Sequence, residues 1–239
     1  MSNIQLVVFD MAGTTVQDKN EVQRCFFEAA TSTGLQANPD RLTAMMGWSK
    51  KRVFETLWAE QIDGDRSDYS TKVDASFTKF KEILEHHYTT QSVQPTAGCL
   101  ELFAWLKSQN IKIALTTGFY REVTNIILNR LGWDQGLNDH YLGSTHSLIQ
   151  ASITPSEIFN NEGRPAPFMI QKAMYRLGVS DSKTVLNIGD TPSDLESGMN
   201  ANCFSYGVTN GTHTAEQLAQ YPNHGLLASL HELKSYLQQ

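Results

Sequence analysis

A short apolar run near the start of the chain ends abruptly in a carboxylate. The segment Leu6-Val7-Val8-Phe9 is rich in β-branched and aromatic residues, which is typical of a buried strand. Asp10 follows it directly, and a Gly13-Thr14 turn comes close behind. In open α/β sheets, ligands bind at the carboxyl ends of the strands. We therefore expect Asp10 to lie at the ligand-binding edge of a parallel sheet.

The second part of the chain, from about residue 95, alternates between strand and helix patterns. Strand patterns occur at 111–116, 142–144 (weakly), 185–188 and 203–208. Helix patterns occur at 100–107, 122–131, 167–177, 195–200 and 230–237. Such alternation is typical of βαβ units. We predict an α/β fold with a Rossmann-like parallel sheet and helices on both faces.

The block between residues 19 and 91 has helix patterns and few strand signals. Apolar residues recur at helical spacing over 21–33, 50–61 and 69–88, and the polar stretch Asp63-Gly64-Asp65-Arg66-Ser67 separates two of these helices. We predict that residues 1–18 and 92–239 form the core domain. Residues 19–91 would form a helical cap inserted after the first strand, acting as a mobile lid over the strand ends.

Charge, cysteine content and hydropathy argue against several classes of binding partner and against secretion or membrane insertion. The 239 residues carry a formal net charge of -6, which argues against non-specific binding to nucleic acid or to an anionic membrane. The three cysteines are dispersed and suggest neither a zinc site nor a disulfide framework. We see no signal peptide and no run of roughly 18 apolar residues that would span a membrane. We expect a cytoplasmic protein without nucleic-acid or membrane partners.

Three further segments place polar groups at strand ends or helix starts. Thr117 and Gly118 follow a strand and offer a hydroxyl and backbone N–H groups, which are good phosphate ligands, although a plain strand turn fits as well. Arg164 lies in a Gly-Arg-Pro loop and is either a phosphate-binding cation or a solvated side chain. Asp190 and Asp194 follow the 185–188 strand.

Asp10, Asp190 and Asp194 are expected at the same edge of the sheet. Clustered carboxylates repel one another unless a hard cation lies between them, and oxygen ligands of this kind suit Mg²⁺. Asp194 alone is also compatible with a helix N-cap. The sequence therefore predicts a Mg²⁺ site next to Asp10.

Taken in order, these four segments resemble the signature motifs of the haloacid dehalogenase superfamily. The resemblance implies that Asp10 is the nucleophile, Thr117 orients the phosphate and Arg164 offsets negative charge. It further implies that Mg²⁺ is bound directly by Asp10, Asp190 and the carbonyl of Ala12, and by Asp194 directly or through water. The residues that it places against the substrate are Ala12, Gly13, Thr14, Met46 and Gly118.

The residue at position 12 limits which reaction of the superfamily we expect. Most phosphatases of the superfamily carry an Asp here as general acid, and this chain has Ala12. Together with Gly163-Arg164-Pro165, this pattern resembles the phosphonoacetaldehyde hydrolases, which break a carbon–phosphorus bond. In that family a cap lysine forms a Schiff base, so that the leaving group departs as an enamine. The segment Met46-Gly47-Trp48-Ser49-Lys50 matches the lysine region, and Lys50 is the implied Schiff-base residue.

The substrate is expected to be a small phosphorylated or phosphonate metabolite. Two positions depart from the family pattern, because Val53 stands where His is typical and Phe119 where Tyr is typical. A phosphatase for a small phosphomonoester is therefore the alternative function, and a non-catalytic phosphate-binding relative or a dehalogenase fits less well. Lys51 and Arg52 are expected to help lower the pKa of Lys50. A homodimer formed through the cap is left open.

Overall fold

The computed structural model describes residues 4–62 and 67–238, so Asp63-Gly64-Asp65-Arg66 of the polar stretch lies outside the described residues. The strands are β1 (Leu6–Phe9), β2 (Lys112–Thr116), β3 (Ala151–Ile153), β4 (Val185–Gly189), β5 (Phe204–Val208) and β6 (Gly225–Leu227). The α-helices are α1 (Glu21–Thr33), α2 (Pro39–Ala44), α3 (Lys50–Gln61), α4 (Tyr69–Thr90), α5 (Cys99–Ser108), α6 (Arg121–Leu131), α7 (Phe168–Arg176), α8 (Pro192–Asn200), α9 (Ala215–Leu218) and α10 (Leu233–Leu237). Short 3₁₀ turns are η1 (Pro155–Glu157), η2 (Phe159–Asn161), η3 (Ser182–Thr184) and η4 (Leu230–Glu232).

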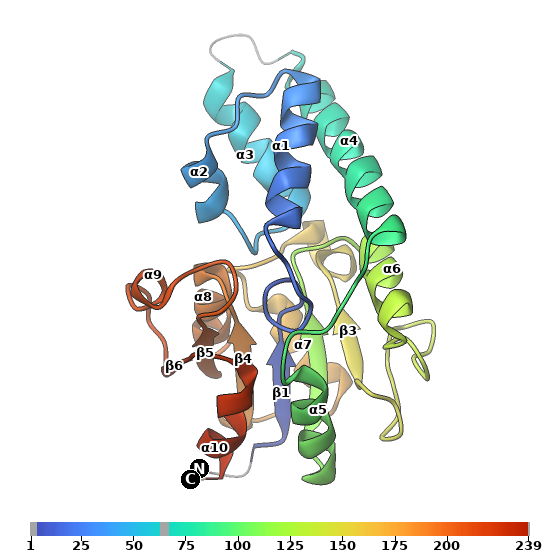
Figure 1. Cartoon of the computed structure of the whole chain (residues 1–239), viewed down its shortest axis with the longest axis vertical. Helices are drawn as coiled ribbons and strands as arrows, with labels where there is room; N and C mark the ends of the chain where they lie inside the picture. The colour runs from blue at the N-terminus through green and yellow to red at the C-terminus, as the bar shows by residue number, and fades with distance from the viewer. Residues whose placement is uncertain (1–3, 63–66, 239) are drawn as a thin grey trace.

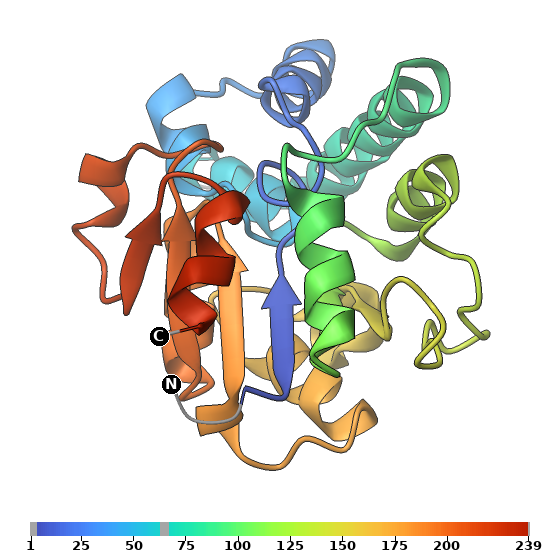
Figure 2. The same cartoon turned by 60° about the horizontal axis from the view of Figure 1, so that its bottom comes forward.

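The strands form a six-stranded sheet in the order β3-β2-β1-β4-β5-β6. Every neighbouring pair is parallel, and β1 lies between β2 and β4, with Val8 level with Ala114 on one side and Asn187 on the other. Figure 2 shows β1 (blue) and β4 (orange) running side by side in the same direction. With β2 parallel on the other side of β1, the carboxyl ends of the three strands meet in the middle of one sheet edge. The predicted α/β fold with a parallel sheet is confirmed.

Helices cover both faces of the sheet because successive strand residues point to opposite sides. Val7 and Phe9 belong to the cluster that includes α5 and α10, and the Phe9 and Phe103 ring centroids lie 5.3 Å apart. Leu6 and Val8 belong to a second cluster with α7. β1 is thus buried on both faces, which explains its continuous apolar run.

The helices α1 to α4 lie together beyond the carboxyl end of the sheet (Figure 1). Their interior is aromatic: the ring centroids of Phe26 and Phe80 are 4.2 Å apart, and those of Phe54 and Phe80 are 5.6 Å apart. α1 ends at Gly34, whose positive φ of 76° lets its N–H bond back to the last turn of the helix. This part of the chain packs around its own apolar residues.

The two connections between this helical part and the sheet run beside each other. Val16 and Pro95 form an antiparallel bridge, and the N–H of Gln17 donates to the carbonyl of Gln94 at 2.9 Å. The N–H of Thr96 donates to the carbonyl of Thr15 at 3.0 Å. The chain therefore leaves and re-enters the sheet region at one place.

One predicted strand is wrong. Residues 142–144 do not form a strand of the sheet; β3 is Ala151–Ile153 instead. Leu142 makes only an isolated antiparallel bridge, to Ala151, because the chain doubles back between them. The sequence patterns also missed α2, which starts at an Asn38 cap, and the three-residue strand β6.

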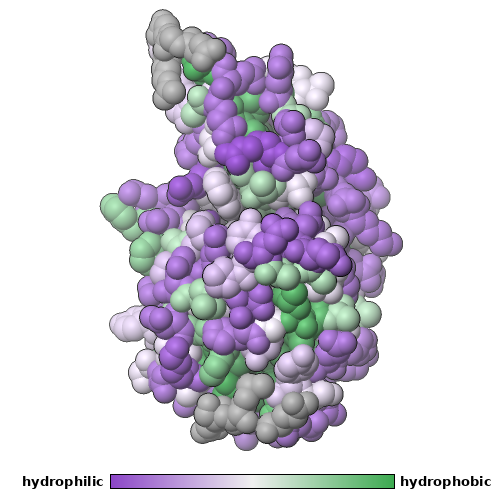
Figure 3. All heavy atoms as spheres, turned by 90° about the vertical axis from the view of Figure 1, so that its left-hand side faces the viewer, coloured by the Kyte–Doolittle hydropathy of each residue, from purple (hydrophilic) through white to green (hydrophobic). Residues whose placement is uncertain are grey.

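The exposed apolar side chains do not gather on the helical part, where the predicted dimer interface would lie. Figure 3 shows a face on which hydrophilic side chains predominate. Among the described residues, the large apolar side chains with high exposure lie outside 19–91; they are Leu100, Phe159, Phe168 and Tyr175. A dimer formed through the cap stays a prediction. None of the described helices has the length and apolar character needed to cross a bilayer.

Candidate active site

Asp10 follows β1 and lies buried at the centre of the sheet edge, where its main partner is Arg164. Nη1 of Arg164 lies 2.6 Å from Oδ1 of Asp10, and the arginine side chain is only 1% exposed. Burial raises the pKa of Asp10 well above its usual range, the Arg164 charge opposes this, and the carboxylates of Asp194 and Asp190 add to it. The ion pair thus holds the carboxylate in place and favours its ionised form.

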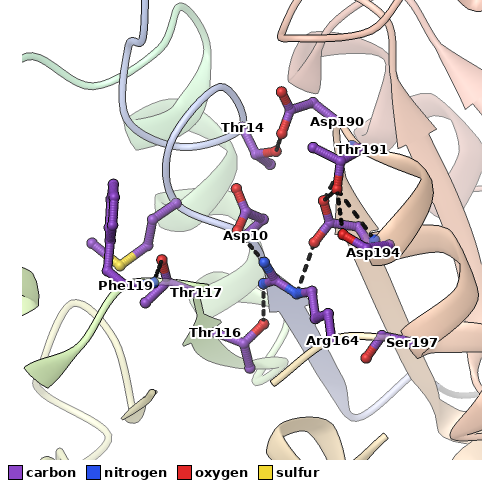
Figure 4. A network of polar contacts seen from close by, with 12 residues as sticks. Asp10, Thr14, Thr116, Thr117, Phe119, Arg164, Asp190, Thr191, Asp194 and Ser197 are labelled. Carbon is purple, nitrogen blue, oxygen red and sulfur yellow. Dashed lines mark hydrogen bonds and ion pairs between the residues drawn. The ribbon is translucent and has the colours of Figure 1, made fainter. Parts of the chain in front are cut away.

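Arg164 holds three groups at once. Nη2 donates to the hydroxyl of Thr116 at 2.8 Å, and Nε lies 2.9 Å from Oδ1 of Asp194 (Figure 4). The planar guanidinium with its fixed donors suits such a task. The arginine therefore ties the ends of β1 and β2 to the start of α8.

Asp190 follows β4 and is held from both sides. Its Oδ1 accepts a hydrogen bond from the Thr14 hydroxyl at 3.1 Å, and its Oδ2 accepts one from the N–H of Thr212 at 2.6 Å. Burial and the Asp194 charge raise the pKa of Asp190 to about 6. Gly13 has a φ of +88°, and a Cβ there would collide with the Asp190 carboxylate. Only glycine allows the β1 loop to lie this close to Asp190.

The three carboxylates fit a divalent cation. Asp10, Asp190 and Asp194 are all buried, and one oxygen of each lies within 4.8 Å of the others. Oδ1 of Asp194 accepts no hydrogen bond among the described residues, although Arg164 lies beside it. Three carboxyl groups face one arginine here, and the available ligand atoms are oxygens. This donor set suits Mg²⁺.

Thr117 and Gly118 lie at the end of β2, as expected. Oγ1 of Thr117 accepts a hydrogen bond from the N–H of Phe119 at 3.1 Å, which leaves its own proton for a ligand. A Cβ at Gly118 would strike the carbonyls of Trp48 and Gly47. This position therefore lies directly under the loop that joins α2 to α3.

That loop also meets the core on its other side. The Ser193 hydroxyl donates to the carbonyl of Met46 at 3.1 Å. Gly47 has a φ of +86°, and a Cβ there would collide with the hydroxyls of Ser193 and Thr191. Met46 is thus placed at the junction between the helical part and the sheet edge that carries the carboxylates.

Lys50 is the first residue of α3 and is buried, with 6% exposure. Its amine lies 5.0 Å from the ring centroid of Phe119 and 5.8 Å from that of Phe26. Burial lowers the pKa of Lys50 to about 8; Asp10 opposes this effect and Arg164 adds to it. The amine is therefore much closer to neutrality at pH 7 than an exposed lysine.

The neighbouring basic residues act differently from the expectation. Nζ of Lys51 forms an ion pair with Asp74 at 2.8 Å, and Arg52 lies over the ring of Trp48 at 5.6 Å. Both side chains have partners of their own on the helical part. Burial accounts for most of the lowered pKa of Lys50.

Several hydroxyl-bearing residues of the site escaped the sequence analysis. Thr116 binds Arg164, and Thr191 donates from its hydroxyl to Oδ2 of Asp194 at 2.5 Å. Thr212, from the loop after β5, reaches Asp190. The sequence could have indicated Thr116 and Thr191, because each adjoins a residue of a recognised motif. Nothing in the local sequence marks Thr212.

Comparison with known proteins gives a family match over most of the chain. Residues 7–208 match the model of the family described as haloacid dehalogenase-like hydrolase. A phosphonoacetaldehyde hydrolase from Bacillus cytotoxicus is 30% identical over 219 residues, which cover 87% of this chain and 77% of the relative. One from Latilactobacillus sakei is 28% identical over 217 residues, with 87% and 76% covered.

Solved structures support the same fold. A phosphonoacetaldehyde hydrolase-like protein from Oleispira antarctica superposes with a TM-score of 0.79 at 18% identity, covering 99% of this chain and 92% of that one. A predicted phosphoglycolate phosphatase from Haemophilus somnus gives a TM-score of 0.73 at 18% identity, with complete coverage of both chains. At such identities the likeness concerns the fold alone.

Proposed function

The chain belongs to the haloacid dehalogenase-like hydrolases, and on this basis we propose that it is a Mg²⁺-dependent hydrolase of the carbon–phosphorus bond in phosphonoacetaldehyde or a related small phosphonate. The observation that carries the proposal is the buried amine of Lys50, whose pKa is lowered to about 8 beside the carboxylate edge of the sheet. The relatives named phosphonoacetaldehyde hydrolase support it.

Lys50 is the proposed electrophile-forming residue. Its neutral amine adds to the substrate aldehyde, and loss of water gives a protonated imine. Ala12 offers no acid to protonate a leaving group. With the imine in place none is needed, because the electron pair of the breaking C–P bond moves into the imine and yields an enamine. The enamine takes a proton on carbon to become an imine, and water then releases acetaldehyde and the free Lys50 amine.

Asp10 is the proposed nucleophile. Its carboxylate oxygen attacks phosphorus as the C–P bond breaks, and water then hydrolyses the aspartyl phosphate. Arg164, bound to Asp10, and the free proton of Thr117 are suited to hold the phosphoryl oxygens. Gly13, Thr14 and Gly118 shape the space around the phosphoryl group.

A bound Mg²⁺ would be held by Asp10, Asp190 and the carbonyl of Ala12, with Asp194 close by. It would offset the negative charge of the carboxylates and of the phosphoryl group. Thr14 and Thr212 orient Asp190 for this role.

The alternative is a phosphatase for a small phosphomonoester. Val53 and Phe119 favour it, since both are buried apolar side chains at positions where the resembling family carries polar groups. In that case Lys50 would bind substrate as a cation and form no imine.

Borohydride trapping separates the two functions. Incubation with phosphonoacetaldehyde and borohydride should leave a reduced two-carbon adduct on Lys50, detected by peptide mass spectrometry. The Lys50→Arg variant keeps the charge but forms no imine, so it should lose C–P cleavage. The matched control is Lys51→Arg, which keeps an exposed lysine's charge and should leave activity unchanged.

A phosphomonoester panel completes the test. If the protein forms no adduct, and both it and the Lys50→Arg variant hydrolyse phosphomonoesters, the phosphatase alternative holds and the imine mechanism is wrong.

A further inference from the structure

Tyr88 lies at the end of α4, on the side of the helix that faces the protein interior. It follows Phe80 and Leu84 at helical spacing, and like them it is buried, with 4% exposure. Its position places it next to the connection by which the chain returns to the sheet. A phenylalanine would pack equally well at this position, so the hydroxyl is the group that needs an explanation beyond packing.

The Tyr88 ring packs against the same phenylalanine as the amine of Lys50. The ring centroids of Tyr88 and Phe119 lie 5.8 Å apart at 74°, an edge-to-face contact. Nζ of Lys50 lies 5.0 Å from the Phe119 centroid. Phe119 thus forms a wall shared by the phenol and the amine.

The hydroxyl of Tyr88 makes no hydrogen bond among the described residues, and it is not one of their fully buried unpaired polar atoms, so it keeps some accessible surface. Buried tyrosine hydroxyls usually have one. Two other tyrosines of this region follow that rule: Tyr120 donates to Glu85 at 2.9 Å, and Tyr69 donates to the carbonyl of Glu55 at 2.9 Å. The Tyr88 hydroxyl is therefore available to a ligand.

Burial keeps this hydroxyl in its protonated form. Burial raises the pKa of Tyr88 well above its usual range, and Asp18, Cys25, Glu21 and Asp10 add to the effect. Asp10 and Asp18 also act on the Lys50 amine. The phenol thus stays protonated, and it shares two charged neighbours with the amine.

We propose that Tyr88 relays a proton during formation of the Lys50 imine. When the neutral amine adds to the aldehyde, nitrogen carries an extra proton and the former carbonyl oxygen carries negative charge. The phenol gives its proton to that oxygen and takes one from the nitrogen, so the neutral carbinolamine forms and Tyr88 ends as it began. This inference rests on the proposed C–P hydrolase function.

The relay supplies a group that can transfer a proton, which the side chains of Phe119 and Val53 near Lys50 do not provide. Phe119 and Val53 are apolar, and neither can move a proton. The Tyr88 hydroxyl, carried on a ring that packs against Phe119, would supply this group. The polar group thus comes from a segment distant in sequence from both motifs.

The test isolates imine formation from bond cleavage. In an Asp10→Asn background, which removes the nucleophile, the rate of borohydride trapping on Lys50 reports imine formation alone. Adding Tyr88→Phe should slow trapping by about 10²-fold. Adding Tyr69→Phe instead removes a hydroxyl from the other end of α4 and should leave the rate unchanged. Binding of ethylphosphonate, which has no carbonyl, should be the same in all these variants.

Two results would overturn the relay. One is trapping as fast with Tyr88→Phe as without it. The other is slower trapping accompanied by an equal loss of ethylphosphonate binding, since that would mean a packing role. Failure of the proposed function looks different, because no adduct would then form even with Tyr88 in place.

Discussion

Arg164 lies 2.6 Å from the carboxylate of Asp10, although 154 positions separate the two residues in the chain. The same guanidinium reaches Asp194 and Thr116, so one buried cation connects three of the strand ends and loops that make the site. The order of the sheet makes this contact feasible, because β1 lies between the strands that carry the other groups.

Replacing Asp10 with Asn should abolish turnover while leaving the fold intact. The amide is nearly isosteric with the carboxylate but cannot attack phosphorus, so kcat should fall by at least about 10³-fold. Steady-state kinetics and circular dichroism check this together. A variant with near-parental kcat would rule out Asp10 as nucleophile.

Replacing Arg164 with Met should destabilise the protein by about 3–5 kcal/mol, because Asp10 and Asp194 would stay buried without their cation. Urea denaturation measures the loss. Arg41→Met is the matched control, since its ion pair with Glu60 is exposed and should contribute little. An equal loss of unfolding free energy in the two variants would contradict the claim that Arg164 compensates the buried carboxylates.

Replacing Lys50 with Met should stabilise the protein at pH 7 and abolish C–P cleavage. The folded state lowers the pKa of this lysine from 10.5 to about 8, so at pH 7 it holds a buried ammonium at a cost on the order of 3 kcal/mol. Above pH 8 the folded state binds fewer protons here than the unfolded state. The parental protein therefore gains stability with pH between about 8 and 10.5, and the difference from the variant should shrink. Denaturation of both proteins across this range checks the sign.

Activity on the aldehyde should rise with pH and level off above about 8, since only the neutral amine of Lys50 attacks. The pH profile of kcat/KM measures this. Phosphomonoester hydrolysis, if any is detected, should not follow the same rise. A flat profile for the aldehyde would show that deprotonation of Lys50 is not required.

Mg²⁺ should raise the melting temperature of the protein and be required for activity. Binding among Asp10, Asp190 and Asp194 adds about 2.7 kcal/mol when the free ion exceeds its dissociation constant a hundredfold. Chelation should remove both effects. The Asp190→Asn variant should show no Mg²⁺-dependent stabilisation; if it responds like the parental protein, the ion binds elsewhere.

Replacing Gly47 with Ala should reduce kcat/KM by about 10²-fold, because the new Cβ collides with Ser193 and Thr191 and moves the loop before Lys50. Gly34→Ala is the matched control. Gly34 also has a positive φ, of 76°, but nothing lies within 4 Å of the added Cβ. Both variants should lose similar backbone stability, and only Gly47→Ala should lose activity.

The parts of the site that the sequence predicted best are those that sit next to a strong strand signal. Asp10 and Asp190 follow short buried strands, and parallel strands bring their carboxyl ends to the same edge. The prediction failed at residues 142–144, where Leu142 and Gly143 form only isolated antiparallel bridges, one of them to Ala151 of β3. Short segments of this kind take their conformation from tertiary contacts.

Side chains that reach the site from distant loops were not predictable. Thr212 contacts Asp190 from the loop after β5, and Tyr88 packs on Phe119 from the end of α4. In both cases the pairing depends on how elements cross in space, and no periodicity in the chain encodes it. The pKa of Lys50 has the same origin, since it depends on burial between helix and sheet rather than on adjacent charges.

The paired connections at Val16 and Pro95 bear on how such a chain can evolve. Because the inserted segment begins and ends at one spot, it could be shortened, enlarged or exchanged without opening the sheet. The sheet would keep the phosphoryl chemistry, while a different insert would bring different groups to the substrate. Lys50 and Tyr88 both lie on the insert, whereas Ala12 lies in the loop after β1, so a change of reaction class in this architecture would require exchange of one contiguous stretch together with a substitution at position 12.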